Sequence, residues 1–291
     1  MPVKTSKSNK AKPKTATKKV SAKKKGKKTA KATSPFAHVR SWLFLTLIIF
    51  VAAILLYFAA STVINKYSFQ IRARFGDIVY PSGDVRGIDI SHHQGEIDWS
   101  KLRNSTLNNS PIRFIFIKAT EGTNLLDENF NQNFFYCRKN GIVRGAYHFF
   151  TTTSDAIRQA KYYCKMVQLE DDDMAPILDV EQKGNLSKQQ LQQAVLKWLQ
   201  YVEKHYGVKP ILYTSVSFKK SYLDSPEFDQ YPLWLAHYYV PELKYKGDWS
   251  FWQHSDRGKV DGIDEKVDVD VFNGKYEDMM RLTVGEGEGN S

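Results

Sequence analysis

Two acidic residues, Asp179 and Glu181, follow a short apolar run and are separated by a single valine. In a β-strand, side chains two positions apart lie on the same face, so both carboxyl groups would point into the same space. Repulsion between two such groups raises the pKa of one of them, so one acid can keep its proton while the other is anionic. A proton donor beside an anion is what cleavage of a glycosidic bond requires.

The same spacing also has plainer interpretations. An Asp-x-Glu pair occurs by chance in many proteins, as a solvated strand end or as a pair of calcium ligands. The choice between these roles depends on what the rest of the chain places beside Asp179 and Glu181.

Eight apolar, strand-like runs could position this pair, with helical stretches between the earlier ones. The predicted strands are residues 85–91, 113–121, 145–150, 175–181, 209–215, 232–238, 250–255 and 267–272. Helices are predicted over 127–140, 154–169 and 187–206, with Ser154 and Ser187 as N-caps. Towards the C-terminus the gaps are too short, or too rich in Gly and Asp, for full helices. We therefore expect an α/β fold, an irregular TIM-like (β/α) barrel with helices missing between the last strands.

Functional residues of such a barrel gather at the carboxyl ends of its strands. Those ends carry Asp89, Lys118, Glu121, Tyr147, Asp179, Glu181, Tyr213, Trp234, Gln253, Asp268 and Asp270. Of the aromatic residues, Tyr147, Tyr213 and Trp234 are expected to contact sugar rings, whereas the others are expected to fill the core. Lys118 and Glu121 are expected to form an ion pair. A structural role and a ligand-binding role are equally expected for this pair.

The positive charge of the chain is confined to its first residues. The 291-residue chain has a net charge of +11, but residues 1–40 hold 14 of the 42 Lys and Arg residues and no acidic residue. The remaining part therefore carries a net charge of −3. We expect a disordered Lys-rich tail. For this tail, a role as a segment that simply stays in the cytoplasm is favoured over binding to nucleic acid or to lipid headgroups, because a membrane helix follows it.

The uncharged run from Trp42 to Ile64 is long enough to cross a hydrocarbon core of about 30 Å at about 1.5 Å per helical residue. A cleaved signal peptide is disfavoured, because the apolar run and the basic region before it are too long. The positive-inside rule then keeps the tail in the cytoplasm and exports the rest. The expected organisation is a tail at 1–40, a transmembrane helix at 41–64, a connector at 65–83, a barrel domain at 84–283 and a disordered tail at 284–291.

The cysteines and histidines give no indication of a metal or cofactor. Cys137 and Cys164 both lie in the exported part, and the sequence is equally compatible with a disulfide between them and with two buried free thiols. The pair His92 and His93 has no partner at ligand spacing, and no Cys/His cluster suggests zinc. We expect no metal site and no cofactor, and the sequence does not indicate an oligomeric state.

Eight short motifs follow one another between Arg86 and Asn273. They are residues 87–95 (GIDISHHQG), 97–99 (IDW), 117–122 (IKATEG), 145–149 (GAYHF), 179–181 (DVE), 233–238 (LWLAHY), 252–253 (WQ) and 267–268 (VD). In this order they resemble the glycoside hydrolase family 25 lysozymes, the Chalaropsis-type N-acetylmuramidases. The resemblance implies a peptidoglycan muramidase that cuts the β-1,4 bond between N-acetylmuramic acid and N-acetylglucosamine, with peptidoglycan glycan strands as its partner.

The resemblance also implies residue roles. Glu181 is implied as the general acid that protonates the leaving oxygen, and Asp179 as the carboxylate that stabilises the transition state or orients the N-acetyl group. Asp89 and Asp268 match two further acidic positions that orient the substrate and shape the electrostatic field. Substrate binding is expected from Tyr147, Tyr213, Trp234, Lys118 and Gln253.

Topology and resemblance together predict a single-pass protein of the bacterial inner membrane, with a cytoplasmic N-terminus and a periplasmic or extracellular catalytic domain. Nucleic acid is not an expected partner. The alternative is a catalytically inactive peptidoglycan-binding module anchored to the membrane. Retention of all four acids argues against it, because a pure binding module has no need to bear the electrostatic cost of clustering them.

Overall fold

The computed structural model describes residues 35–76, 78–83 and 85–285. The predictions made for residues 1–34 and 286–291 lie outside these ranges. The chain divides into two compact units, with the boundary between Ala60 and Ser61.

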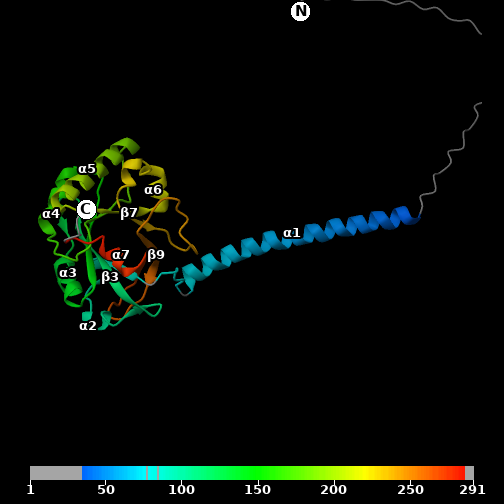
Figure 1. Ribbon diagram of the computed structural model, residues 1–291, viewed down its shortest axis with the longest axis horizontal. Helices are drawn as coiled ribbons and strands as arrows, with labels where there is room; N and C mark the ends of the chain where they lie inside the picture. Colours follow the sequence, from blue (N-terminus) through cyan, green and yellow to red (C-terminus); the bar gives the residue numbers. More distant parts are fainter. Residues whose placement is uncertain (1–34, 77, 84, 286–291) are drawn as a thin grey trace, which may run out of the picture. The chain divides into compact units, whose positions relative to one another are not determined.

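Helix α1 (Pro35–Phe75) contains the predicted transmembrane segment (Figure 1). Its stretch Val39–Phe75 is long and apolar enough to cross a membrane, and the most apolar part of this stretch has no buried residues. The helix does not end at Ile64, so the first half of the segment predicted as a connector, residues 65–83, is helical. Between Pro35 and Gly76 the helix contains no further Pro or Gly, and the N–H of Gly76 donates to the carbonyl of Arg72 at 2.7 Å.

Eight strands close into a barrel in the second unit (Figure 1). They are β1 (Arg86–Ile90), β3 (Ser110–Glu121), β5 (Val143–Phe149), β6 (Ile177–Asp179), β7 (Ile211–Ser215), β8 (Leu233–Ala236), β9 (Phe251–Gly258) and β10 (Val267–Phe272). Two short strands, β2 (Thr106–Leu107) and β4 (Leu125–Leu126), pair with β3. Each predicted strand coincides with one barrel strand. The barrel closes because β1 pairs with both β3 and β10.

The last strand runs in the opposite direction to the others. Among the eight barrel strands, neighbours from β1 to β9 are parallel, whereas β10 is antiparallel to both β9 and β1. In the described stretches between β8 and β10, residues 237–250 and 259–266, no helix occurs. The fold is therefore a mixed α/β barrel whose last connections lack helices.

Helices surround the parallel strands on the outside (Figure 1). They are α2 (Trp99–Leu102), α3 (Phe130–Lys139), α4 (Ala156–Met166), α5 (Lys188–Tyr206) and α6 (Val216–Tyr222), with 3-10 turns at His92–Gln94 and Pro226–Phe228. The last helix, α7 (Tyr276–Met280), follows β10, and its Met279 is buried in one cluster with Phe272. Ser187 caps α5 as predicted, with its side chain accepting from Gln190 N. Ser154 does not cap α4: its hydroxyl bonds to Thr151 Oγ1 at 3.0 Å, and Asp155 accepts from Arg158 N instead.

Alternation along the strands divides the core into two clusters. Ile88, Ile115 and Leu178 belong to the cluster that packs under the helices. Phe114, Phe116, Ile177, Trp234 and Phe251 belong to the second cluster, which fills the barrel interior. Because side chains alternate in a strand, residues two positions beyond these interior residues also face inward.

Gly87 makes room for the interior aromatic rings. A Cβ at this position would lie 2.3 Å from the ring of Phe114. That ring packs against Phe116 and Phe251 at centroid distances of 4.9 and 5.2 Å, so it has little freedom to move.

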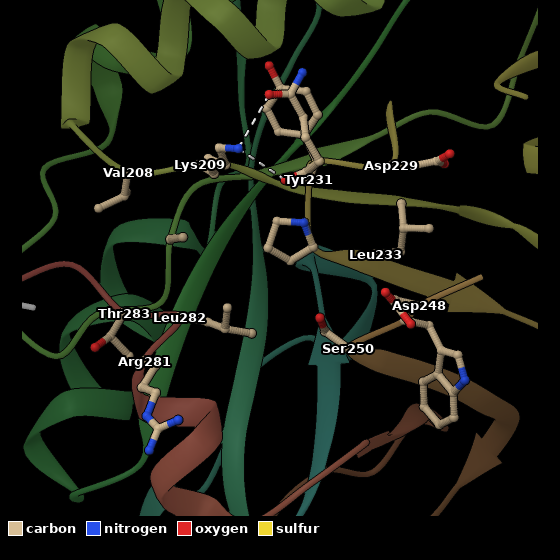
Figure 2. Close-up of a pocket in the computed structure, with 14 residues that line it drawn as sticks. Val208, Lys209, Asp229, Tyr231, Leu233, Asp248, Ser250, Arg281, Leu282 and Thr283 are labelled. Carbon is tan, nitrogen blue, oxygen red and sulfur yellow. Dashed lines mark hydrogen bonds between the residues drawn. The ribbon is translucent and has the colours of Figure 1, made fainter. Parts of the chain in front are cut away.

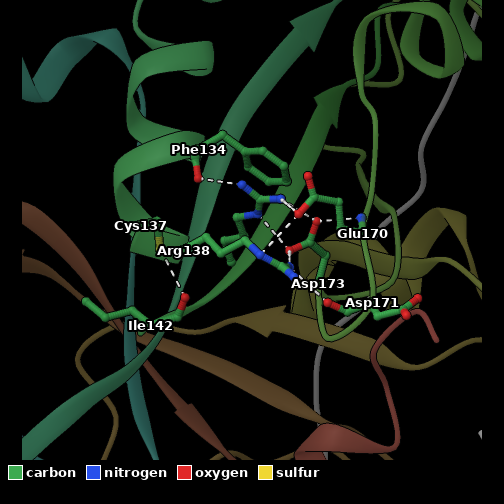
Figure 3. Close-up of polar contacts among 8 residues, drawn as sticks. Phe134, Cys137, Arg138, Ile142, Glu170, Asp171 and Asp173 are labelled. Atoms are coloured by element: carbon green, nitrogen blue, oxygen red, sulfur yellow. Dashed lines mark hydrogen bonds and ion pairs between the residues drawn. The ribbon is translucent and has the colours of Figure 1, made fainter. Parts of the chain in front are cut away.

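An ion-pair network lies at the amino end of β5 (Figure 3). Arg144 donates from Nε and Nη2 to the two oxygens of Asp173, at 2.6 and 2.8 Å, and Arg138 donates to Asp173 at 3.2 Å. The two thiols near these elements, Cys137 and Cys164, are free and buried, and burial raises the pKa of each. Val284, near the end of the described residues, also packs here, since its N–H donates to the carbonyl of Asp173 at 2.7 Å.

Candidate active site

The four predicted acids meet at one end of the barrel. Asp89 lies in β1 and pairs across the sheet with Asp268 of β10. Asp179 ends β6, and Glu181 follows it two residues later on the same face. The negative charge of Glu181 acts on Asp89, Asp179 and Asp268, and Asp89 acts on Asp179 and Asp268. The acids therefore form one electrostatically coupled cluster.

The reversal of β10 explains how Asp268 joins this cluster. In a parallel strand, a residue at the second position would lie at the opposite end of the barrel from Asp89 and Asp179. Because β10 is antiparallel, its start lies at the carboxyl ends of the other strands, and Asp268 reaches the same rim.

Burial raises the pKa of the site aspartates. For Asp89 and Asp179 the pKa lies well above the ordinary value, first because of burial and then because of neighbouring carboxylates. Burial, followed by the charges of Asp89, Asp256 and Glu181, raises the pKa of Asp268 to about 9. Burial and mutual repulsion therefore favour the protonated forms of these aspartates, and Asp268 holds a proton at neutral pH.

The cluster opens to solvent through Glu181, which is exposed, while Asp89 and Asp179 are buried beneath it. The Oδ1 atom of Asp179 is buried and has no hydrogen-bond partner among the described residues. A buried oxygen without a partner is costly unless a ligand supplies one. This atom is therefore a candidate for direct contact with substrate.

Gln253 binds protein groups rather than facing solvent. Its side chain is 2% exposed and its Nε2 donates to Asp89 Oδ2 at 2.6 Å. Its Oε1 accepts from the hydroxyls of Tyr213 and Tyr238, at 2.7 and 2.5 Å. With these bonds made, the amide has little capacity left for a sugar, in contrast to the substrate-binding role expected from sequence. The structure instead gives Gln253 the geometry to orient Asp89.

Two of the three aromatic residues predicted to contact sugar are buried. Trp234 is 2% exposed and its indole N–H donates to Asp270 Oδ1 at 2.7 Å. Tyr213 is 5% exposed and packs against Trp234 at a centroid distance of 4.3 Å. The closed barrel is narrow enough for these rings to fill it, which the sequence pattern could not show. Tyr147 keeps a partly exposed side chain at the rim.

Lys118 and Glu121 form the predicted ion pair, with a distance of 2.7 Å between Nζ and Oε2. The ammonium group also lies 5.1 Å from the centre of the Phe149 ring. Its positive charge acts on Asp179, lowering the pKa of that carboxyl against the larger effect of burial. Lys118 thus contributes to the electrostatics of the acid pair.

Two polar groups beside this cluster were given no role from the sequence: Asp127, which was not singled out, and Asp270, which was placed at a strand end. Asp127 accepts from the Nδ1 of His92 at 2.7 Å, so His92 has a carboxylate partner 35 residues away in the chain. Asp270, two residues after Asp268 on the same face, is fully buried and binds Trp234. The period-two spacing of Asp268 and Asp270 was the signal available in the sequence.

A pocket of about 350 Å³ at the opposite end of the barrel contains none of the predicted site residues (Figure 2). It is lined by residues that precede strands β6 to β9, such as Lys209 and Tyr231, and by Arg281 near the C-terminus. Functional sites of barrels lie at the carboxyl ends of the strands, so this pocket is not the candidate active site.

Comparison with known proteins agrees with this geometry. The family model described as "Glycosyl hydrolases family 25" matches residues 88–263. The uncharacterized protein YegX of Escherichia coli K12 is 40% identical over 223 residues, which cover 76% of this chain and 82% of that protein. Lysozyme M1 of Streptomyces globisporus is 30% identical over 217 residues, covering 68% and 71% of the two chains.

Among solved structures, a bacterial lysozyme from Streptomyces coelicolor superimposes with a TM-score of 0.63 and 30% identity. The match covers 69% of this chain and 97% of that one. Family model, relatives and architecture all point to the same group of enzymes, and the matched region contains the acid cluster except for Asp268. The chain therefore belongs to glycosyl hydrolase family 25 and is a glycoside hydrolase.

Proposed function

We propose that this protein is a peptidoglycan muramidase that hydrolyses the β-1,4 bond between N-acetylmuramic acid and N-acetylglucosamine. The observation that carries the proposal is the coupled cluster of Asp89, Asp179, Glu181 and Asp268 at the carboxyl end of the barrel in a family 25 chain. Lysozymes and muramidases among the relatives support the same substrate.

In this proposal Asp179 and Glu181 share one proton. Burial and the neighbouring Glu181 raise the pKa of Asp179 well above its ordinary value, which favours the protonated form of that carboxyl. Glu181, the exposed member, delivers that proton to the leaving oxygen as the glycosidic bond breaks. Asp179 is then an anion beside the positive charge that develops on the sugar ring, and it stabilises that charge. A water molecule adds to the anomeric carbon and returns a proton to the pair.

The remaining site residues act around this step. Asp89 and Asp268 orient the substrate and shape the field, and Gln253 holds Asp89 in place through its amide. Tyr147, which keeps a partly exposed ring, is the favoured sugar contact of the three predicted aromatic residues. Lys118 lies near enough to Asp179 to balance part of its charge.

The proposed location is the bacterial inner membrane. Residues 41–64 within α1 would span the bilayer, with the Lys-rich tail at 1–40 in the cytoplasm and the barrel domain at 84–283 on the other side. This arrangement would place the active site in the compartment that contains peptidoglycan.

The test is an assay of the purified full chain in detergent with peptidoglycan. We expect the wild type to release new reducing ends and Glu181→Gln to be about 100-fold slower or worse, because the proton donor is lost. Glu277→Gln, which changes an exposed glutamate of α7, is the matched control and should keep wild-type activity. Sacculus binding without cleavage by the wild type would favour the inactive binding module instead.

A further inference from the structure

A second pocket lies beside the acid cluster, at the same end of the barrel. It has a volume of about 410 Å³ and is lined by residues that include His92, Glu96, Glu128 and Asn133. One wall follows β1, which carries Asp89, and the other follows β3 and β4 at the start of α3. Since β1 and β3 are parallel, both walls rise from the carboxyl ends of barrel strands.

The pocket is electrostatically close to the site. Asp127, which binds His92 on one wall, acts on Tyr147 together with Asp89, Asp179 and Asp268. Tyr147 is therefore within electrostatic range of both the acid cluster and the pocket wall. A glycan bound across the acid cluster would place a substituent of one sugar within reach of the pocket.

Polar groups without partners line this pocket. Asn133 is 2% exposed, yet its side-chain amide makes no hydrogen bond in the described part of the chain, and its Nδ2 is fully buried. Glu96 and Glu128 are exposed carboxylates that form no ion pair with any described residue. A buried amide without a partner is destabilising in the free protein, so its retention points to a ligand that supplies the missing bonds.

The walls of the pocket are held in position before a ligand arrives. Ser91 and Gln94 form a reciprocal capping box around the short 3-10 turn that carries His92. Asn129 Nδ2 donates to the carbonyl of Gly95 at 3.3 Å and so joins the two walls. Binding to such a preorganised pocket avoids much of the entropy cost of ordering loops.

The lining selects among ligand classes. No Trp, Tyr or Phe is among the residues that line the pocket, so it lacks the aromatic platform on which a sugar ring would stack. In the described residues, no group of three or more His, Cys, Asp or Glu side chains could hold a metal ion. Two free carboxylates suit an ammonium group, and an amide that both donates and accepts suits a peptide bond.

We propose that this pocket binds the stem peptide of peptidoglycan, with Glu96 and Glu128 paired to the ammonium group of its diamino acid and Asn133 hydrogen-bonded to its backbone. The inference rests on the proposed muramidase function and adds a peptide-reading site to it. The enzyme would then favour glycan strands whose stem peptides carry a free amine over strands without peptides.

The test compares three substrates with the full chain in detergent. They are glycan strands with intact stem peptides, the same strands with the diamino acid acetylated on its free amine, and strands stripped of peptide by an amidase. We expect the KM of the wild type to be about tenfold lower on intact strands than on the other two, with kcat little changed. Equal KM values on all three substrates would overturn the inference.

The variant Glu96→Gln/Glu128→Gln should raise KM about tenfold on intact strands and leave it unchanged on stripped strands. Asn133→Leu, which places an apolar side chain of similar size in a buried position, should do the same. Glu277→Gln is again the control. A variant that loses activity equally on intact and stripped strands would contradict a peptide-binding role.

Calorimetric titration with the free stem tripeptide gives a readout that does not depend on hydrolysis. We expect the wild type to bind the tripeptide, and the double variant to bind it at least tenfold more weakly. Peptide binding without hydrolysis of any strand would refute the muramidase proposal but keep the pocket assignment. Hydrolysis with equal KM on all strands and no peptide binding would refute only the pocket assignment.

Discussion

Asp268 offers a direct test of the electrostatics of the site. Burial and neighbouring acids raise the pKa of its carboxyl to about 9, compared with an ordinary value near 4. Between these two values the native protein holds a proton that the unfolded chain has lost. The variant Asp268→Asn removes the titrating group while keeping a side chain of nearly the same shape.

The sign and size of the effect follow from proton linkage. Because the native state binds more protons than the unfolded state, the free energy of unfolding falls as pH rises through the window from about 4 to about 9. One retained proton corresponds to a slope of about 1.4 kcal/mol per pH unit. If solvent screening makes the pKa shift of Asp268 smaller, the pH window becomes narrower, but the slope inside the window stays the same. Between pH 5 and 7 we therefore expect the wild type to lose about 2–3 kcal/mol relative to Asp268→Asn.

The assay is urea denaturation of the full chain in detergent at pH 5, 6 and 7, followed by tryptophan fluorescence. Asp264→Asn, which changes an exposed aspartate in the same β9–β10 loop, is the matched control and should follow the wild-type pH profile. Parallel profiles for the wild type and Asp268→Asn would show that Asp268 does not retain a proton in the native state. The reasoning about the acid cluster would then be wrong.

Two further substitutions test how the barrel interior supports the site. Gln253→Met removes three hydrogen bonds made by a buried amide. We expect urea denaturation to show a loss of about 3 kcal/mol in the free energy of unfolding, and reducing-end release to show a loss of at least tenfold in kcat. Unchanged kcat would show that Asp89 does not depend on Gln253. Gly87→Ala places a methyl group 2.3 Å from the Phe114 ring and should cost at least about 2 kcal/mol in urea denaturation. The double variant Gly87→Ala/Phe114→Leu should recover part of this loss, and no recovery would contradict the proposed clash.

The sequence pattern predicted the strands well because the barrel strands are buried on both faces and therefore appear as continuous apolar runs. Each predicted strand overlaps an observed one, and Asp89, Asp179 and Glu181 lie at the predicted rim. The direction of β10 could not be predicted, since the pattern of a strand is the same in both directions. Asp268 was expected at the rim as part of a strand end, but it lies near the start of a reversed strand.

The burial of three residues that were predicted to bind substrate has a common cause. Trp234, Tyr213 and Gln253 were expected to face substrate because they lie near strand ends, whereas packing inside the barrel buries them. Whether an inward-facing side chain reaches the opening depends on the width of the barrel, which no local pattern contains. Asn133 was missed for a related reason, because one polar residue in a helix gives no sign that it lacks a partner.

The reversed last strand has a consequence for how this enzyme could be modified. Because β9 and β10 are antiparallel neighbours, the eight-residue loop 259–266 joins them directly and leads into Asp268. In the connections from β1 to β8, a longer insertion would have to accommodate a packed helix. Here an insertion would only lengthen the β9–β10 hairpin, so the rim beside Asp268 is open to change by insertion. Libraries of loop length at this position would be a practical route to altered substrate preference.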